Sequence, residues 1–261
     1  MIDRLLLAYA FIIGACIGSF LNVCIYRWPA ELSVLRPRSR CGSCGQQVRW
    51  YDNVPLVNWL LLRGRCRDCG TAISIQYPLV ELATGVIWLT AALRFGFDLE
   101  ALRSAVFLTL LLGIAMTDAR EMVIPDQFSL GGTAIGLALA AVPGGIAFTS
   151  ALIGAVAGYV LFWGIKIVAE KALKKPALGV GDIHMMAMIG AFLGTAGAML
   201  TVMLGSLAGL LIGVPLTRLR RGQLAPLGTY LPLGTFLAIG AFIAHFWGAA
   251  ILDWYIGLLA S

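Results

Sequence analysis

Charged residues are scarce in this sequence. Only 12% of its 261 residues are Asp, Glu, Lys or Arg, whereas 60% are hydrophobic, and the mean hydropathy is +0.89. A soluble domain is nearer half apolar and a quarter charged. A soluble fold of this length could not bury so much apolar surface in one core, whereas a lipid bilayer accepts that surface directly. The composition therefore excludes an ordinary soluble protein and predicts an all-α integral membrane protein.

A secretory signal peptide is also not evident. The first apolar run is long, contains Asn22, and lacks both a basic region before it and a clear small-residue cleavage site. The net charge of +6 would suggest a nucleic-acid ligand in a soluble protein. In a membrane protein the basic loops set the orientation instead, so we expect no nucleic-acid partner.

Apolar runs separated by polar breaks predict the membrane helices. A spanning helix needs roughly 17–25 apolar residues. The sequence has eight candidate runs; the sixth is short, and its boundary with the seventh falls near Gly194–Gly197. We therefore predict a polytopic bundle of about eight transmembrane helices. The runs are 5–25, 77–93, 102–117, 128–142, 148–169, 183–194, 196–216 and 231–252.

The basic residues support this count. If the N-terminus faces outward, sixteen of the 19 Lys and Arg residues fall on the inner side, eight of them between Arg27 and Arg67. The three outer ones are Arg4, Arg94 and Arg103. Cytoplasmic loops carry such an excess of basic residues. The pattern predicts both termini outside and the 27–77 loop in the cytoplasm.

Glycines at four-residue spacing predict helix-packing faces. Small residues at this spacing let membrane helices approach closely. They are Gly14/Gly18, Gly154/Gly158, Gly190/Gly194 and Gly205/Gly209/Gly213.

Four cysteines in the 27–77 loop form two CxxC pairs, and each pair is followed by glycine. The pairs are Cys41/Cys44 and Cys66/Cys69, with 21 residues between them. Two such turns can direct four thiolates onto one ion. Two disulfides or a redox pair would be the alternative in an oxidising compartment, but disulfides are rare in the cytoplasm. We therefore predict a small structural zinc module.

Two aspartates at the ends of predicted helices are candidate catalytic residues. Asp118 ends the third run and Asp182 opens the sixth, so the topology places both at the same membrane face. Two carboxyls at one depth can share a proton, with one activating water and the other polarising a carbonyl. Taken alone, each could equally be a helix cap or an ion-pair partner.

Other acidic residues have simpler interpretations. Asp126 follows Ile124-Pro125 and precedes the fourth run, where an aspartate is most simply an N-cap. Glu81 lies near the inner end of the second run, where it could pair with an arginine of the 27–77 loop or line a site. The sequence leaves both alternatives open.

Motifs along almost the whole chain resemble one family, the type IV prepilin peptidases. These are the bifunctional leader peptidases and N-methyltransferases of pilus and type II secretion systems. Asp118 with Ile124-Pro125-Asp126 resembles the family's first aspartate motif, and Gly179-Val-Gly181-Asp182 resembles its GxGD motif. The N-terminal similarity lies in GSFLNVCIYR (18–27), PRSRC (37–41), WYDNVP (50–55), RGRC (63–66) and ISIQYPLVE (73–81).

The resemblance implies an aspartic peptidase in which Asp118 and Asp182 form the catalytic pair. The implied substrate is a prepilin or pseudopilin whose short basic leader is cut after a glycine at the cytoplasmic membrane face. The implied second reaction methylates the new N-terminal amine, usually of phenylalanine, with S-adenosylmethionine. The implied division is a first helix (1–26), a methyltransferase-associated zinc module bound by Cys41, Cys44, Cys66 and Cys69 (27–77), and a peptidase domain (78–261).

The sequence departs from the family pattern at one position and leaves other roles open. His184 stands where the family often has lysine, so the pH profile could differ. No Gly-rich nucleotide fingerprint identifies the S-adenosylmethionine site, which we expect near the zinc module and the first two helices. A peptidase without methyltransferase activity is one alternative. A transporter or assembly scaffold is another, although the inverted repeats that would favour it are not found.

Overall fold

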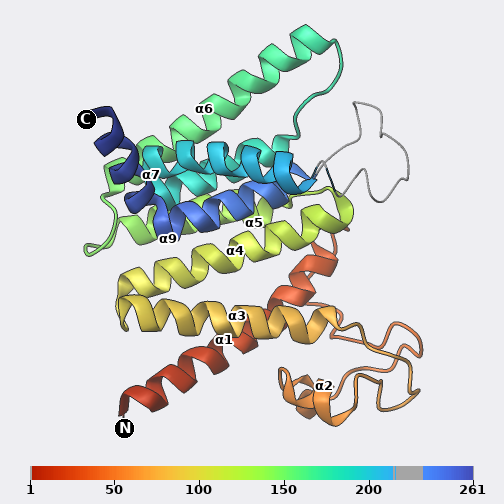
Figure 1. The fold of residues 1–261 in the computed structure, drawn as a ribbon. Coiled ribbons are helices and arrows are strands. Elements are labelled where there is room, and N and C mark those ends of the chain that lie inside the picture. The colour runs from red at the N-terminus through yellow and green to blue at the C-terminus, as the bar shows by residue number, and fades with distance from the viewer. Residues whose placement is uncertain (1, 214, 216–231, 261) are drawn as a thin grey trace. The chain divides into compact units, whose positions relative to one another are not determined.

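The structure is a computed structural model that describes residues 2–213, 215 and 232–260 (Figure 1). The described residues are helical apart from loops and two isolated β-bridges. The chain forms two compact units, residues 1–109 and 110–261. The helices are α1 (Ile2–Arg27), η1 (Trp50–Asn53), α2 (Val57–Leu61), α3 (Gln76–Phe95), α4 (Leu99–Glu121), α5 (Asp126–Ala140), α6 (Phe148–Leu173), α7 (Val180–Ala208), η2 (Gly209–Gly213) and α9 (Leu233–Ala260).

Six helical segments of the described chain are long and apolar enough to cross a membrane. The protein is therefore a multi-pass helical membrane protein, as its composition predicts, but the predicted count of eight is not confirmed. α5 has 15 residues, and at 1.5 Å per residue it spans roughly 22 Å of a hydrocarbon core about 30 Å thick. The six segments are 3–27, 76–95, 99–121, 148–173, 180–213 and 233–258.

The sixth predicted run and most of the seventh lie in α7, which consists of two helices joined by a kink at Gly194. Gly194 has φ 70° and ψ −175°, a conformation that interrupts the helix and favours glycine. The residues before Gly194 run antiparallel to α6, because Gly190 meets Gly154 while Gly194 lies by Ser150. We call the segments on the two sides of Gly194 the first and second legs of α7.

The second leg of α7 returns toward the start of the first leg. Gly181 lies against Ile124, and Gly234 at the start of α9 lies against the same isoleucine. Gly205 of the second leg packs on Leu237, three residues after Gly234. In a straight helix Gly181 and Gly205 would be roughly 36 Å apart, so these shared neighbours require the chain to fold back between them. The two predicted runs therefore correspond to two helical segments that meet at Gly194, although residues 180–213 together form one of the six candidate spans, and the predicted count of eight stays a prediction.

In the first unit, α1 and α3 pack antiparallel through the predicted Gly14/Gly18 face. A methyl group on Gly14 would lie 2.7 Å from the Thr84 carbonyl oxygen, and one on Gly18 would lie 2.7 Å from the Glu81 Cα. The absence of a side chain is therefore what allows the two backbones to touch. The Asn22 side chain extends this contact by donating a hydrogen bond to the Tyr77 carbonyl at 3.0 Å.

In the second unit, glycine contacts hold α6 against the first leg of α7. A methyl group on Gly190 would lie 2.0 Å from the Gly154 carbonyl oxygen, and one on Gly158 would lie 2.4 Å from the Met186 carbonyl oxygen. Three of the predicted packing faces are therefore confirmed. In the series beginning at Gly205, the close backbone contact is made by Gly205, whereas a methyl group on Gly209 would meet Phe236 at an ordinary 3.7 Å.

Two sequence predictions remain as they were. The cytoplasmic arginines expected at 218, 220 and 221 lie outside the described residues. The division by function into 1–26, 27–77 and 78–261 stays a prediction, because the two units divide the chain by packing.

We predict that Gly190→Ala destabilises the protein by about 1–3 kcal/mol, because the new methyl group has no space against the α6 backbone. The matched control is Gly164→Ala in α6, where no heavy atom lies within 4 Å of the added methyl group. That change should be neutral or stabilising by up to about 1 kcal/mol, because alanine favours helix over glycine. Thermal unfolding of the purified protein in detergent measures the difference. Equal unfolding temperatures for the two variants would contradict the proposed backbone contact.

Candidate functional site

The four loop cysteines converge in the first unit. Their sulfur atoms all lie within 4.8 Å of one another, and Cys41 Sγ is 3.7 Å from Cys69 Sγ. Four thiolates around a tetrahedral zinc ion at about 2.3 Å lie roughly 3.8 Å apart. The donor set and spacing therefore fit zinc, and the structure brings together the four residues that the sequence predicts.

Two backbone turns of the same construction position these thiols. In the first turn the Gly45 N–H donates to the Cys41 carbonyl, and in the second the Gly70 N–H donates to the Cys66 carbonyl, both at 2.9 Å. Gly45 has φ 70° and Gly70 has φ 71°, so each position needs glycine for its conformation. The prediction that the glycine after each CxxC pair permits a tight turn is thus confirmed.

Contacts within the loop support the cluster. The Arg67 guanidinium donates two hydrogen bonds to the Asp52 carboxylate, at 2.8 and 2.6 Å. These bonds hold the pKa of Asp52 below its usual value. Within the cluster, hydrogen bonds with Thr71 lower the pKa of the Cys69 thiol to about 6, whereas burial and the neighbouring thiols raise the pKa of Cys44 to about 12, so the Cys69 thiol ionises before that of Cys44. The Arg67–Asp52 pair could not be predicted from the sequence, because the two residues are 15 positions apart in an irregular loop and no helical or strand periodicity relates them.

We predict that the purified protein contains about one zinc per chain. The double variant Cys41→Ser/Cys66→Ser should lose that metal, because it removes one thiolate from each pair. Cys16→Ser is the matched control, since Cys16 is an exposed cysteine of α1 outside the cluster. Elemental analysis gives the zinc content of each protein. A wild-type protein without zinc, or a double variant with unchanged zinc, would refute the assignment.

Asp118 is buried at the end of α4 in the second unit, with 5% of its surface exposed. Its Oδ2 accepts a hydrogen bond from the Thr235 N–H at 2.7 Å and lies 3.1 Å from the Thr235 hydroxyl. The Gly234 backbone also bonds to this carboxyl group. Both donors belong to the first turn of α9, whose N–H groups have no partner within the helix. Asp118 therefore caps α9 in space, a contact across 117 positions that the sequence could not reveal.

Asp182 lies in the first turn of α7 and is partly buried. Its carboxyl group bonds to the Gly179 backbone and interacts electrostatically with Asp118. A methyl group on Gly179 would lie 3.0 Å from Asp182 Oδ2, so the first glycine of the GxGD motif leaves room for the carboxylate. Negative charge is favoured at the N-terminal end of a helix. The structure thus brings the two predicted aspartates into one site.

Ile124 lies between the two helix starts that carry this site. A methyl group on Gly181 would lie 2.8 Å from Ile124 Cβ, and one on Gly234 would lie 2.6 Å from Ile124 Cδ1. Glycines at these positions therefore let α7 and α9 begin beside the same loop residue. This close packing is what places Asp182 and the donors to Asp118 near each other.

The prediction that Asp126 is an N-cap is wrong. Pro125 occupies the N-cap position of α5, where no side chain caps the helix. Asp126 Oδ1 instead lies 2.7 Å from His184 Nδ1, and the His184 ring stacks on Tyr159 with centroids 6.2 Å apart. His184 is two residues from Asp182, so this pair borders the aspartate site. Asp126 thus contacts a residue of another helix, α7, and does not cap its own helix, α5.

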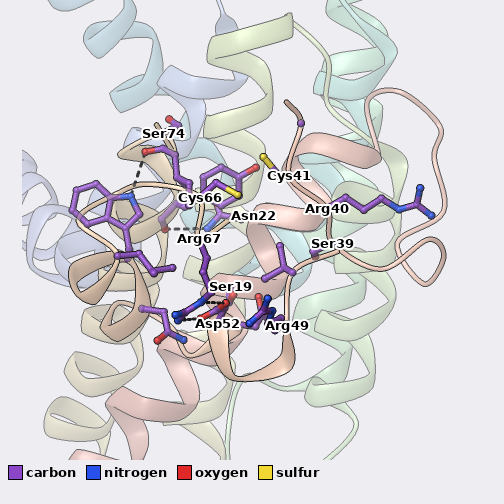
Figure 2. Close-up of a pocket in the computed structure, with 18 of the residues that line it drawn as sticks. Ser19, Asn22, Ser39, Arg40, Cys41, Arg49, Asp52, Cys66, Arg67 and Ser74 are labelled. Atoms are coloured by element: carbon purple, nitrogen blue, oxygen red, sulfur yellow. Dashed lines mark hydrogen bonds and ion pairs between the residues drawn. The ribbon is translucent and has the colours of Figure 1, made fainter. Parts of the chain in front are cut away.

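A cavity of about 550 Å³ lies between α1, α3 and the cysteine loop, wholly within the first unit (Figure 2). Its lining includes Asn22 and Glu81 from the helices, with Cys41, Asp52 and Arg67 from the loop. Figure 2 shows Ser19 and Asn22 of α1 together with the loop residues Asp52 and Arg67 around this space. Glu81 is buried, and its Oε2 accepts a hydrogen bond from the Leu56 N–H at 2.8 Å. Pairing with an arginine of the 27–77 loop was one of the two alternatives for Glu81. None of the loop arginines that the structure describes forms an ion pair with it.

These features define a class: a multi-pass helical membrane protein with a four-thiol loop and, at helix ends, a buried and a partly buried carboxyl group. Comparison with known families identifies one family within this class. Residues 12–95 match the bacterial peptidase A24 N-terminal domain, and residues 105–214 match the type IV leader peptidase family.

Three relatives are named prepilin leader peptidase/N-methyltransferase. The chain is 43% identical to the Myxococcus xanthus protein over 84% of the chain and 65% of that protein. It is 33% identical to the Stutzerimonas stutzeri protein over 95% of the chain and 92% of that protein. It is 34% identical to the Pseudomonas aeruginosa protein over 94% of the chain and 91% of that protein. No solved structure gives a significant match.

The chain belongs to the type IV leader peptidase family. The resemblance drawn from its motifs is confirmed, and with it the class of enzyme, a membrane peptidase with methyltransferase activity.

Proposed function

We propose that this protein cleaves the short basic leader of prepilins or pseudopilins after a glycine, with Asp118 and Asp182 as the catalytic pair. The observation that carries the proposal is the meeting of two aspartates, 64 positions apart, at the adjoining ends of α4 and α7. Placing two carboxyl groups in a membrane bundle costs free energy, so such a pair is by default a candidate functional site. The relatives' names supply the substrate class.

The geometry suits acid–base hydrolysis. Two neighbouring carboxyl groups share one proton, because both cannot easily be ionised at close range. The ionised group takes a proton from water, while the protonated group donates a hydrogen bond to the scissile carbonyl oxygen. Thr235 and Gly234 fix Asp118 from one side. They are positioning residues, since they act through the Asp118 carboxyl group.

The proposed orientation places both sites on the cytoplasmic side of the bacterial inner membrane. Its support is the excess of Lys and Arg in the loops on that side, with half of these residues in the cysteine loop. A prepilin would meet the aspartates where its polar leader joins its apolar helix. In this arrangement the apolar helix stays in the bilayer while water reaches the cut.

We also propose that the first unit binds S-adenosylmethionine and methylates the new N-terminal amine. The cavity of about 550 Å³ is within the range of roughly 300–1,000 Å³ of small-molecule sites. Its lining combines polar and apolar side chains from α1, α3 and the cysteine loop, which suits a nucleoside that carries charged groups. When bound, S-adenosylmethionine would supply the methyl group. The cysteine cluster with zinc would hold the loop wall of this cavity in place.

We predict that Asp118→Asn and Asp182→Asn each lower the rate of leader cleavage by at least about 10³-fold. Asparagine is nearly isosteric but cannot exchange a proton with water, and loss of a general acid or base costs roughly 10²–10⁴-fold. Cleavage of a purified prepilin by detergent-solubilised protein provides the measurement, with unchanged thermal unfolding as the check on folding.

Asp253→Asn is the matched control, because Asp253 is exposed in α9 outside the site. Its cleavage rate should equal that of the wild type. A folded Asp118→Asn protein with near wild-type cleavage would remove Asp118 from the catalytic pair.

A further inference from the structure

The helix-lined wall of the first-unit cavity carries acceptors at one level. Asn22 lies five residues before the end of α1, and Glu81 lies five residues after the start of α3. Each is therefore about 7–8 Å inside the helix ends, and both line the cavity. The opposite wall, formed by the loop, carries guanidinium groups that are already paired, Arg67 with Asp52 and Arg49 with Asp68.

Asn22 presents a buried acceptor without a partner. Its side chain is 1% exposed. The Nδ2 amide donates to the carbonyl oxygens of Tyr77 and Gly18, at 3.0 and 3.3 Å. This fixes the amide orientation and leaves Oδ1 buried without a hydrogen-bond partner. Such an acceptor destabilises the protein unless a donor reaches it.

Glu81 presents a buried carboxylate without a cation. Its residue surface is 8% exposed, and it bonds to the Leu56 N–H and the Ser19 hydroxyl. In the part of the chain that the structure describes, no arginine or lysine forms an ion pair with Glu81. A carboxylate has about four lone-pair sites, so two remain open. The open acceptor positions of Asn22 and Glu81 thus lack N–H donors and a cationic partner, both of which an ammonium group supplies. Arg27, which also lines the cavity, donates instead to the carbonyl oxygens of Ser33 and Pro37.

We propose that Glu81 and Asn22 bind the α-amino group of the residue that leader cleavage exposes. This inference rests on the proposed methyltransferase function and names the contact to the methyl acceptor. The acceptors lie on the membrane-side wall, where the end of a pilin helix held in the bilayer arrives. The bound ammonium group would lose one proton to the solvent of the cavity, and the two N–H groups that it keeps would donate to Glu81 and Asn22, so that its lone pair points away from this wall. That lone pair would form the N–CH3 bond as the S–CH3 bond of S-adenosylmethionine breaks, with S-adenosylhomocysteine as the leaving group. The pair would therefore both select a free amine and orient it for methylation.

Peptide binding to the full-length protein in detergent micelles tests this contact. The probes are two synthetic peptides that begin with phenylalanine and continue with apolar residues, one with a free amine and one acetylated. Each carries a C-terminal dye for fluorescence anisotropy. We expect the wild type to bind the free-amine peptide at least about tenfold more tightly, because charge-assisted hydrogen bonds are strong. Equal affinities in the wild type would overturn the proposal without any variant.

Glu81→Gln should lower the affinity for the free-amine peptide about tenfold and leave that for the acetylated peptide unchanged. The control is Glu31→Gln, the same chemical change at an exposed loop glutamate outside the cavity lining, and it should keep the wild-type preference. Zinc content and thermal unfolding check that each variant is folded. Retention of the preference in a folded Glu81→Gln protein would refute the proposal.

S-adenosylhomocysteine separates this inference from the function on which it rests. The wild type should bind it, and a wild type that does not would contradict the methyltransferase proposal itself. Glu81→Gln should leave its affinity unchanged. Glu81→Gln could instead weaken the binding of S-adenosylhomocysteine about tenfold and preserve the preference for the free-amine peptide. Glu81 would then bind an amino group of S-adenosylhomocysteine, and the proposal would be wrong.

Discussion

Direct contact between helix backbones, made possible by glycine, is the constraint on which the rest of the structure depends. Lipid gives apolar helices little reason to associate, so close packing has to hold them together. Gly18 brings α1 onto α3, and Gly190 meets Gly154 between α7 and α6. Gly181 and Gly234 then set the starts of α7 and α9 beside Ile124. The aspartate site is built at that junction, because its carboxyl groups belong to helix ends that only this packing brings together.

The second feature is the treatment of buried carboxyl groups. Asp118 is held by first-turn N–H groups of α9, and Asp182 lies in the first turn of α7. Unsatisfied N–H groups at helix starts and the helix dipole both favour negative charge there. Glu81 has one backbone donor and no described cation. The two aspartates thus lie at neighbouring helix ends and interact with each other, whereas Glu81 lines a cavity that can admit a cationic group.

Sequence reasoning succeeded where the chemistry is local. The CxxC-Gly turns are short, so their spacing predicted the four-thiol cluster, and helical periodicity predicted the glycine faces. Asp118 and Asp182 became candidates because acids at the ends of apolar runs are rare and because motif resemblance paired them, and their catalytic role stays a proposal.

It failed where tertiary contacts decide. Asp126 looked like a cap, but His184, 58 positions away, is its partner. Thr235 had no signal at all, because its role depends on which helix start meets Asp118. The number of membrane spans stays a prediction, because hydropathy does not show how the chain breaks and folds back at Gly194.

Mass analysis of the N-terminus of a prepilin coexpressed with this protein tests the central claim most directly, because it reports cleavage and methylation in one measurement. The account predicts a pilin that has lost its leader after glycine and carries one added methyl group on its new N-terminal amine. A pilin that keeps its leader in the presence of folded, membrane-inserted protein would contradict it.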